Sequence, residues 1–144
     1  MKKRILIIAL IVSLSGTLIS KEISNIKLVY GLEGTHLMVS ASCTPESFDS
    51  NFCEDINFLT TYDEIFIEQF NDLYEKLLYR KDSIKNIDPR IMTIIYYKDS
   101  ISNDTIYFGE HYGISRNGIL LQDNEDLLNL IKQKIGWVNR YNKK

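Results

Sequence analysis

The stretch IMTIIYYKDSISNDTIYFGEHYGISRNGILL, residues 91–121, decides the fold class. Residues 91–97 are almost all β-branched or aromatic, and this composition predicts a central strand. The polar segment 99–104 predicts a turn, where Asp99 and Asp104 are expected for backbone reasons. A second strand is predicted at 105–108.

An Asn-Gly pair marks the next turn of the same stretch. Residues 112–115 and 119–121 flank Arg116-Asn117-Gly118. Asn-Gly is the strongest short hairpin signal, because both residues tolerate the positive φ of a type I′ turn. Since links this short join antiparallel strands, the stretch predicts an antiparallel meander.

Two more strands are predicted towards the N-terminus. The apolar run 26–30 is followed by a segment with two glycines and then by residues 36–42, which together predict a hairpin. We expect residues 43–60 to form a loop.

A helix is predicted from this loop to about Lys81. Thr61-Tyr62-Asp63-Glu64 has the pattern of a capping box in front of Ile65. Apolar residues then recur at helical spacing, opposite a run of charged residues. The apolar positions are Phe66, Phe70, Leu73, Tyr74 and Leu77.

A second helix is predicted near the C-terminus. Asp123 or Asn124 can cap it, and acidic residues follow in its first turn. Gly136 is placed to end it. Its apolar face is Leu127, Leu128, Ile131 and Ile135.

These elements predict an α+β fold in the order β-β-α-β-β-β-α, an antiparallel sheet with two helices packed on one face. No repeat or Pro/Gly-rich linker divides residues 21–144, so we expect a single domain there. The 144 residues are 44% hydrophobic and 25% charged, which is typical of a globular chain.

Residues 1–20 have the pattern of a secretory signal peptide. Lys2-Lys3-Arg4 precedes an apolar run and then small residues near Thr17 and Ser20. We expect cleavage, a periplasmic or secreted location and no stable membrane insertion afterwards. The alternative is an uncleaved anchor, although the run falls short of the roughly 20 residues that a membrane span prefers.

Cys43 and Cys53 are the two cysteines of the chain. An even pair in a polar loop of an exported protein predicts a disulfide. The alternative makes one of them a nucleophile with His36 or His111 as base, but no recognisable catalytic context surrounds either cysteine.

Charge limits the classes of partner. The formal charge is −2, and without the three cations of residues 1–20 the chain has 14 basic and 19 acidic side chains, a net charge of −5. An acidic chain without a basic stripe does not favour nucleic acid. We expect a protein partner, possibly a basic one.

The sequence lacks the motifs that bind nucleotides, catalytic metals or calcium. Two His and two Cys residues do not provide a standard set of zinc ligands. We therefore expect no metal and no cofactor. His111 could act as a general base assisted by the carboxylate of its neighbour Glu110. However, adjacent residues on an extended segment point to opposite faces, so this pair need not interact. An exposed polar turn is the simpler interpretation.

Two sets of residues are candidates for a contact with a partner. Acidic residues run from Glu46 to Glu75, and the alternative interpretation is a solvated face. Tyrosines on neighbouring strands could be exposed anchors or ordinary strand residues. The residues we select for partner binding are Glu54, Asp55, Glu64, Glu68, Asp72, Glu75, Tyr97 and Tyr107.

A binding role is therefore the leading hypothesis, and no catalytic residue is assigned. Exported immunity proteins, which neutralise a toxin, share this size, acidity and lack of catalytic residues, although no motif supports the analogy. The first alternative is a small exported hydrolase that uses His111 with Glu110 or a nearby aspartate. The second is an accessory subunit of an envelope complex.

Overall fold

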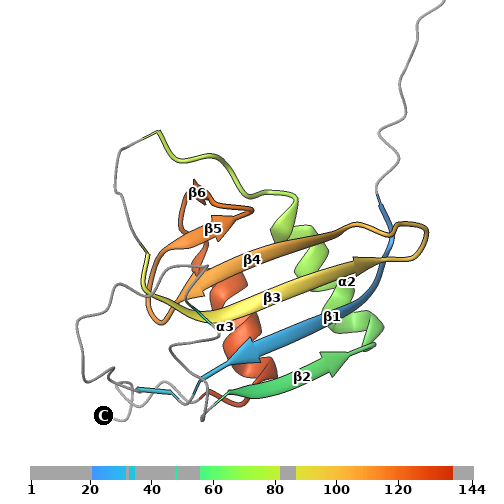
Figure 1. Ribbon diagram of the computed structural model, residues 1–144, viewed down its shortest axis with the longest axis horizontal. Coiled ribbons are helices and arrows are strands. Elements are labelled where there is room, and N and C mark those ends of the chain that lie inside the picture. The colour runs from blue at the N-terminus through green and yellow to red at the C-terminus, as the bar shows by residue number, and fades with distance from the viewer. Residues whose placement is uncertain (1–20, 32, 35–47, 49–55, 82–86, 138–144) are drawn as a thin grey trace, which may run out of the picture.

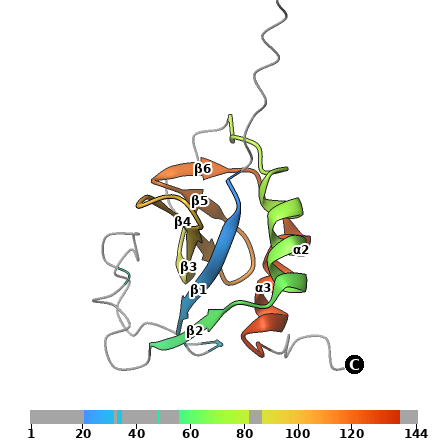
Figure 2. The same cartoon turned by 90° about the vertical axis from the view of Figure 1, so that its right-hand side faces the viewer.

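The computed structural model describes residues 21–31, 33–34, 48, 56–81 and 87–137. These form two layers, a twisted antiparallel sheet and a pair of helices on one of its faces (Figures 1 and 2). The predicted α+β class is confirmed. The elements are β1 (Ile23–Tyr30), β2 (Asn57–Thr61), α2 (Glu64–Tyr74), β3 (Pro89–Tyr97), β4 (Asn103–Gly109), β5 (Ile114–Arg116), β6 (Ile119–Leu121) and α3 (Glu125–Lys134).

The six strands lie in the order β2-β1-β3-β4-β5-β6, with every pair antiparallel. The predicted meander of residues 91–121 forms the run from β3 to β6. Its last turn has positive φ at Asn117 (49°) and Gly118 (81°), as a type I′ turn requires. The Asn-Gly signal is therefore confirmed.

The order of elements differs from the prediction in two respects. Four strands, not the three of the predicted order, separate the helices, because the two flanks of the Asn-Gly turn form one strand each, β5 and β6. Most of β2 falls within residues that we expected to form a loop. The residues of β2, among them one aromatic and two β-branched side chains, pair with β1 from Ile26↔Thr61 to Tyr30↔Asn57. The predicted strand at 36–42 lies outside the described residues.

Helix α2 begins later and ends earlier than predicted. Its N-cap is Asp63, whose carboxylate accepts from the N–H groups of Ile65 and Phe66. Thr61 is not the cap, because it is the last residue of β2; its hydroxyl accepts from the N–H of Asp63 and so supports the cap residue. The helix ends at Tyr74 and not near Lys81.

The early end of α2 has a tertiary cause. Leu78 accepts from the N–H of Gln122 at 2.8 Å, and the N–H of Arg80 donates to Leu120 at 3.2 Å. Tyr79 forms an isolated bridge with Leu121. Backbone groups that would continue the helix are thus bonded along the edge of β6.

Helix α3 follows the sequence signals at both ends. Asn124 is its N-cap and accepts from the N–H of Leu127. At the other end Gly136 has φ +74° and donates to Gln133, while the N–H of Trp137 donates to Lys132. This pair of bonds is a Schellman motif.

The main core lies between the sheet and the two helices. In β3, every second residue points towards the helices and is buried, as Ile91, Thr93, Ile95 and Tyr97 show. The hydroxyl of Thr93 has no hydrogen-bond partner among the described residues. The helices contribute Phe66, Phe70, Tyr74, Leu127, Leu128 and Ile131.

The other face of the sheet carries a second, smaller cluster. Phe48 is buried there with Val29, and its ring lies 6.0 Å from that of Tyr107 in an edge-on contact. Within the described ranges, neither helix is long and apolar enough to cross a membrane.

Candidate binding surface and the polar network behind it

Four acidic side chains lie on the outer side of α2 and its C-cap residue, Glu75. Glu64, Glu68, Asp72 and Glu75 are exposed, at spacings of four, four and three residues that keep them on one side of a helix. The buried residues of α2 occupy the other side. We call these four residues the acidic face.

A hollow of about 820 Å³ lies between the acidic face and the beginning of β1. Glu64 and Glu68 line it, but neither forms an ion pair with any described residue. The other residues that line it are Lys21, Glu22, Ile23, Ser24, Tyr62, Ile67, Asn71 and Lys98.

The two lysines of this hollow already have partners. Lys98 is hydrogen-bonded to Glu22, which raises the pKa of the lysine. The ammonium group of Lys21 lies 5.2 Å from the centre of the Tyr97 ring, a cation–π distance. The hollow is therefore lined by three carboxylates and two ammonium groups, and the two carboxylates on its helical wall, Glu64 and Glu68, form no ion pair within the described residues.

A second hollow of about 490 Å³ lies between the two helices. Asp72 of the acidic face lines it, together with Asp126 of α3 and the partly buried Leu73 and Leu130. Amide side chains and Lys76 complete its wall. The acidic face therefore borders a concave surface on each of its flanks.

The predicted tyrosine anchors do not share a surface. Tyr97 is 9% exposed and faces the helices, so its expected exposure is wrong. The reason is parity, because Tyr97 follows Ile91, Thr93 and Ile95 on the core side of β3. Tyr107 lies on the other face of the sheet, half-buried against Phe48.

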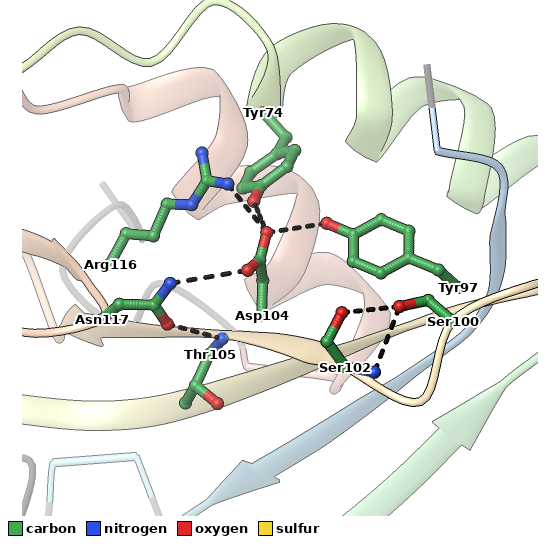
Figure 3. Close-up of polar contacts among 8 residues, drawn as sticks. All are labelled: Tyr74, Tyr97, Ser100, Ser102, Asp104, Thr105, Arg116 and Asn117. Carbon is green, nitrogen blue, oxygen red and sulfur yellow. Dashed lines mark hydrogen bonds and ion pairs between the residues drawn. The ribbon is translucent and has the colours of Figure 1, made fainter. Parts of the chain in front are cut away.

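A polar network holds α2 against the sheet (Figure 3). One carboxylate oxygen of Asp104 accepts from the hydroxyls of Tyr74 (2.6 Å) and Tyr97 (2.8 Å) and from the guanidinium of Arg116 (2.7 Å). Asn117 donates to the other oxygen at 3.4 Å. The network thus joins α2 to β3, β4 and β5.

The electrostatics of this network make it unsuited to acid–base catalysis. Burial alone would raise the pKa of Asp104, but hydrogen bonds from the two tyrosines and the charge of Arg116 outweigh it and lower this pKa to about 2. Burial and the bond to Asp104 raise the pKa of Tyr74, and burial raises that of Tyr97. Asp104 is therefore a weak base at neutral pH and both phenols stay protonated, as a structural link requires.

His111 lies at a tight turn beside α3. Its Nε2 is 3.8 Å from a carboxylate oxygen of Glu110, so these neighbours do not point to opposite faces as expected for an extended segment. The backbone turns here, because the N–H of Gly109 donates to Gly113 at 2.9 Å. The adjoining hollow is about 150 Å³, below the roughly 300 Å³ at which ligand pockets begin.

No described group of three or more His, Cys, Asp or Glu side chains could hold a metal ion. The predicted disulfide of Cys43 and Cys53 lies outside the described residues, as do the candidate partner residues Glu54 and Asp55.

No family model matches this chain, and neither does a curated protein or a solved structure. The function of the chain is therefore inferred from its geometry.

Sequence reasoning missed two parts of the candidate surface. Tyr62 is 70% exposed and lines the hollow between the acidic face and the beginning of β1, whereas the sequence indicates only its place in a capping pattern. Asp104 was assigned to a turn, although it lies in β4 and forms the centre of the polar network. Its only local signal was an acidic residue at a strand end, which does not reveal Tyr74 thirty residues earlier in the chain.

Proposed function

We propose that this chain is an exported protein-binding domain, and that the acidic face of α2 binds a basic region of its partner. The observation that carries the proposal is the pair Glu64 and Glu68, two exposed carboxylates without an ion pair that line a hollow of about 820 Å³. The hollow is large enough to accept a side chain of a partner, and the two carboxylates can attract a positively charged one.

The distribution of charge favours a basic partner. From Asp63 to Lys76 the chain has five acidic side chains and one basic one. Asp63 is paired with Lys134 of α3, so the remaining acids, which form the acidic face, exceed Lys76 by three charges. Exposed charge of one sign accelerates association with an oppositely charged partner and disfavours acidic ones.

The walls of the hollow suit long basic side chains. Tyr62 and Ile67 provide apolar surface beside Glu64 and Glu68. The methylene stem of an arginine or lysine can pack on such surface while its charged end reaches a carboxylate. Arginine also stacks on aromatic rings, which favours an arginine-bearing partner.

An immunity-type inhibitor of an exported toxin is the form of this function that we favour. Its support is the size and acidity of the chain. In addition, Asp104 at the centre of the polar network links α2 to the sheet and does not serve as a catalytic base. The hydrolase alternative has less support, because the hollow beside His111, at about 150 Å³, is smaller than the roughly 300 Å³ at which ligand pockets begin.

The test is a charge reversal on one wall of the hollow. In Glu64→Lys/Glu68→Lys we expect the affinity for a protein captured from the source cells to fall at least tenfold, since two attractions become repulsions. The matched control is Glu33→Lys/Glu125→Lys, which makes the same change of net charge at residues that do not line the hollow.

Affinity would be measured by titration calorimetry at low and moderate salt, after circular dichroism has shown that both variants fold. An unchanged affinity of Glu64→Lys/Glu68→Lys would contradict the proposed surface. A loss of affinity that is the same in both would indicate an effect of net charge alone and would also contradict it.

A further inference from the structure

Among the described residues, the two edges of the sheet differ in their backbone partners. At one edge, β6 is bonded along its outer side by residues 78–80, through the two backbone hydrogen bonds that make up the bridge between Tyr79 and Leu121. At the other edge lies β2, which pairs with β1 alone among the described strands (Figure 1). Half of the backbone N–H and C=O groups of an edge strand point away from its neighbour.

The composition of β2 does not protect this edge. Residues 56–62, INFLTTY, contain no charge, no proline and no glycine. Natural edge strands are usually protected from pairing by lysine, proline, a bulge or a covering segment. Phe58 of β2 is 64% exposed, so the edge also presents apolar surface, with the ammonium group of Lys27 on β1 5.0 Å from the centre of its ring.

We propose that β2 pairs with β2 of a second copy of this chain, antiparallel and across a two-fold axis. A register centred on Leu59 places Phe58 of each copy opposite Thr60 of the other, on the same face of the sheet. An aromatic residue opposite a β-branched one is a favourable cross-strand pair, and the symmetry provides it twice.

A second copy fits this edge better than a charged partner does. A two-fold contact places like residues close together, so any charge in the strand would face its own copy. The uncharged run 56–62 avoids this repulsion, whereas the acidic face of α2 would meet it. The edge and the acidic face therefore suit different partners.

The test measures the oligomeric state of the purified protein by sedimentation equilibrium from low to high micromolar concentration. We expect a monomer–dimer equilibrium, and in Thr60→Lys a dissociation constant at least tenfold higher, because lysine on an edge strand opposes pairing. The control is Ile119→Lys on β6, a similarly exposed position at the opposite edge, which should dimerise like the unmodified protein.

Hydrogen exchange on the unmodified protein gives a second measurement, which does not depend on a variant that folds. Backbone N–H groups of residues 57–61 should exchange more slowly at high concentration than at low concentration, while those of β6 should not change. A monomer at every concentration would overturn the proposal, and so would a dimer that Thr60→Lys leaves intact.

Discussion

Asp104 shows how one side chain can determine the position of a helix. Its carboxylate accepts hydrogen bonds from a tyrosine hydroxyl of α2, a tyrosine hydroxyl of β3 and the arginine guanidinium of β5. These donors lie at positions 74, 97 and 116 of the chain. Arg116 also lies 4.8 Å from the centre of the Tyr74 ring. Ionisation of Asp104 therefore stabilises the contact between the helical layer and the sheet.

The low pKa of Asp104 predicts a specific dependence of stability on pH. Since this pKa is about 2 in the folded chain and 3.8 ordinarily, its contribution is complete above about pH 4 and is lost as the pH falls to 2. Asp104→Asn should lower the free energy of unfolding at pH 7 by about 1–2 kcal/mol, a range reduced for solvent screening around Arg116.

Urea unfolding at pH 7, 4 and 2 would check this prediction. The difference between the unmodified protein and Asp104→Asn should shrink between pH 4 and pH 2. Asp99→Asn, in the exposed turn before β4, serves as the control and should change stability by less than about 0.5 kcal/mol. A constant difference at all three pH values would contradict the assignment.

Thr93 and Thr61 are buried threonines with opposite hydrogen bonding. The Thr93 hydroxyl has no partner among the described residues, whereas the Thr61 hydroxyl accepts from the N–H of Asp63. Valine has the same shape without the polar group, so Thr93→Val should stabilise the fold by about 1 kcal/mol and Thr61→Val should destabilise it by about the same amount. Chemical unfolding would measure both, and the same sign in both variants would disprove the explanation.

At the scale of elements, the end of α3 depends on the backbone of Gly136. Its φ is +74°, and a Cβ built there meets no atom within 4 Å, so only backbone strain opposes a side chain. Gly136→Ala should cost about 1 kcal/mol of unfolding free energy, and Gly136→Asn less, because asparagine tolerates this conformation better. Thermal unfolding would rank the three proteins, and an alanine variant as stable as the glycine protein would be inconsistent with this role.

The elements that the sequence predicted well are those specified by local signals. The Asn117-Gly118 turn and both ends of α3 depend on residues within a few positions of one another. The strand β2 and the end of α2 depend on distant partners, namely β1 and β6. Periodicity alone cannot reveal that the backbone beyond Tyr74 bonds to residues 120–122.

The candidate surface was predictable to a similar extent. Helical spacing set Glu68, Asp72, Glu75 and Lys76 opposite the apolar positions of the predicted helix, and all four are exposed. The hollow beside them was not predictable, because its other wall comes from the beginning of β1 and from Lys98. The side of the sheet that Tyr97 faces was misjudged, since a strand without alternating polarity does not indicate its buried face.

For the molecule as a whole, the helical layer and the sheet edge offer separate surfaces. The acidic face lies on the helical layer, whereas the uncharged edge lies on β2 (Figure 2). The variants that test partner binding, at positions 64 and 68, do not alter β2, and Thr60→Lys does not alter α2. Failure of one proposal would therefore leave the other intact.

The central position of β1 has a consequence for the order of folding. Within the sheet, Ile26 pairs with Ile95, which lies 69 residues later in the chain, whereas neighbouring strands from β3 to β6 are joined by short turns. Closing so long a loop costs more entropy than closing a turn, and folding slows as such contacts become more distant. We expect the meander from β3 to β6 to form first, and the N-terminal strand, although it is synthesised first, to be among the last elements to reach its place.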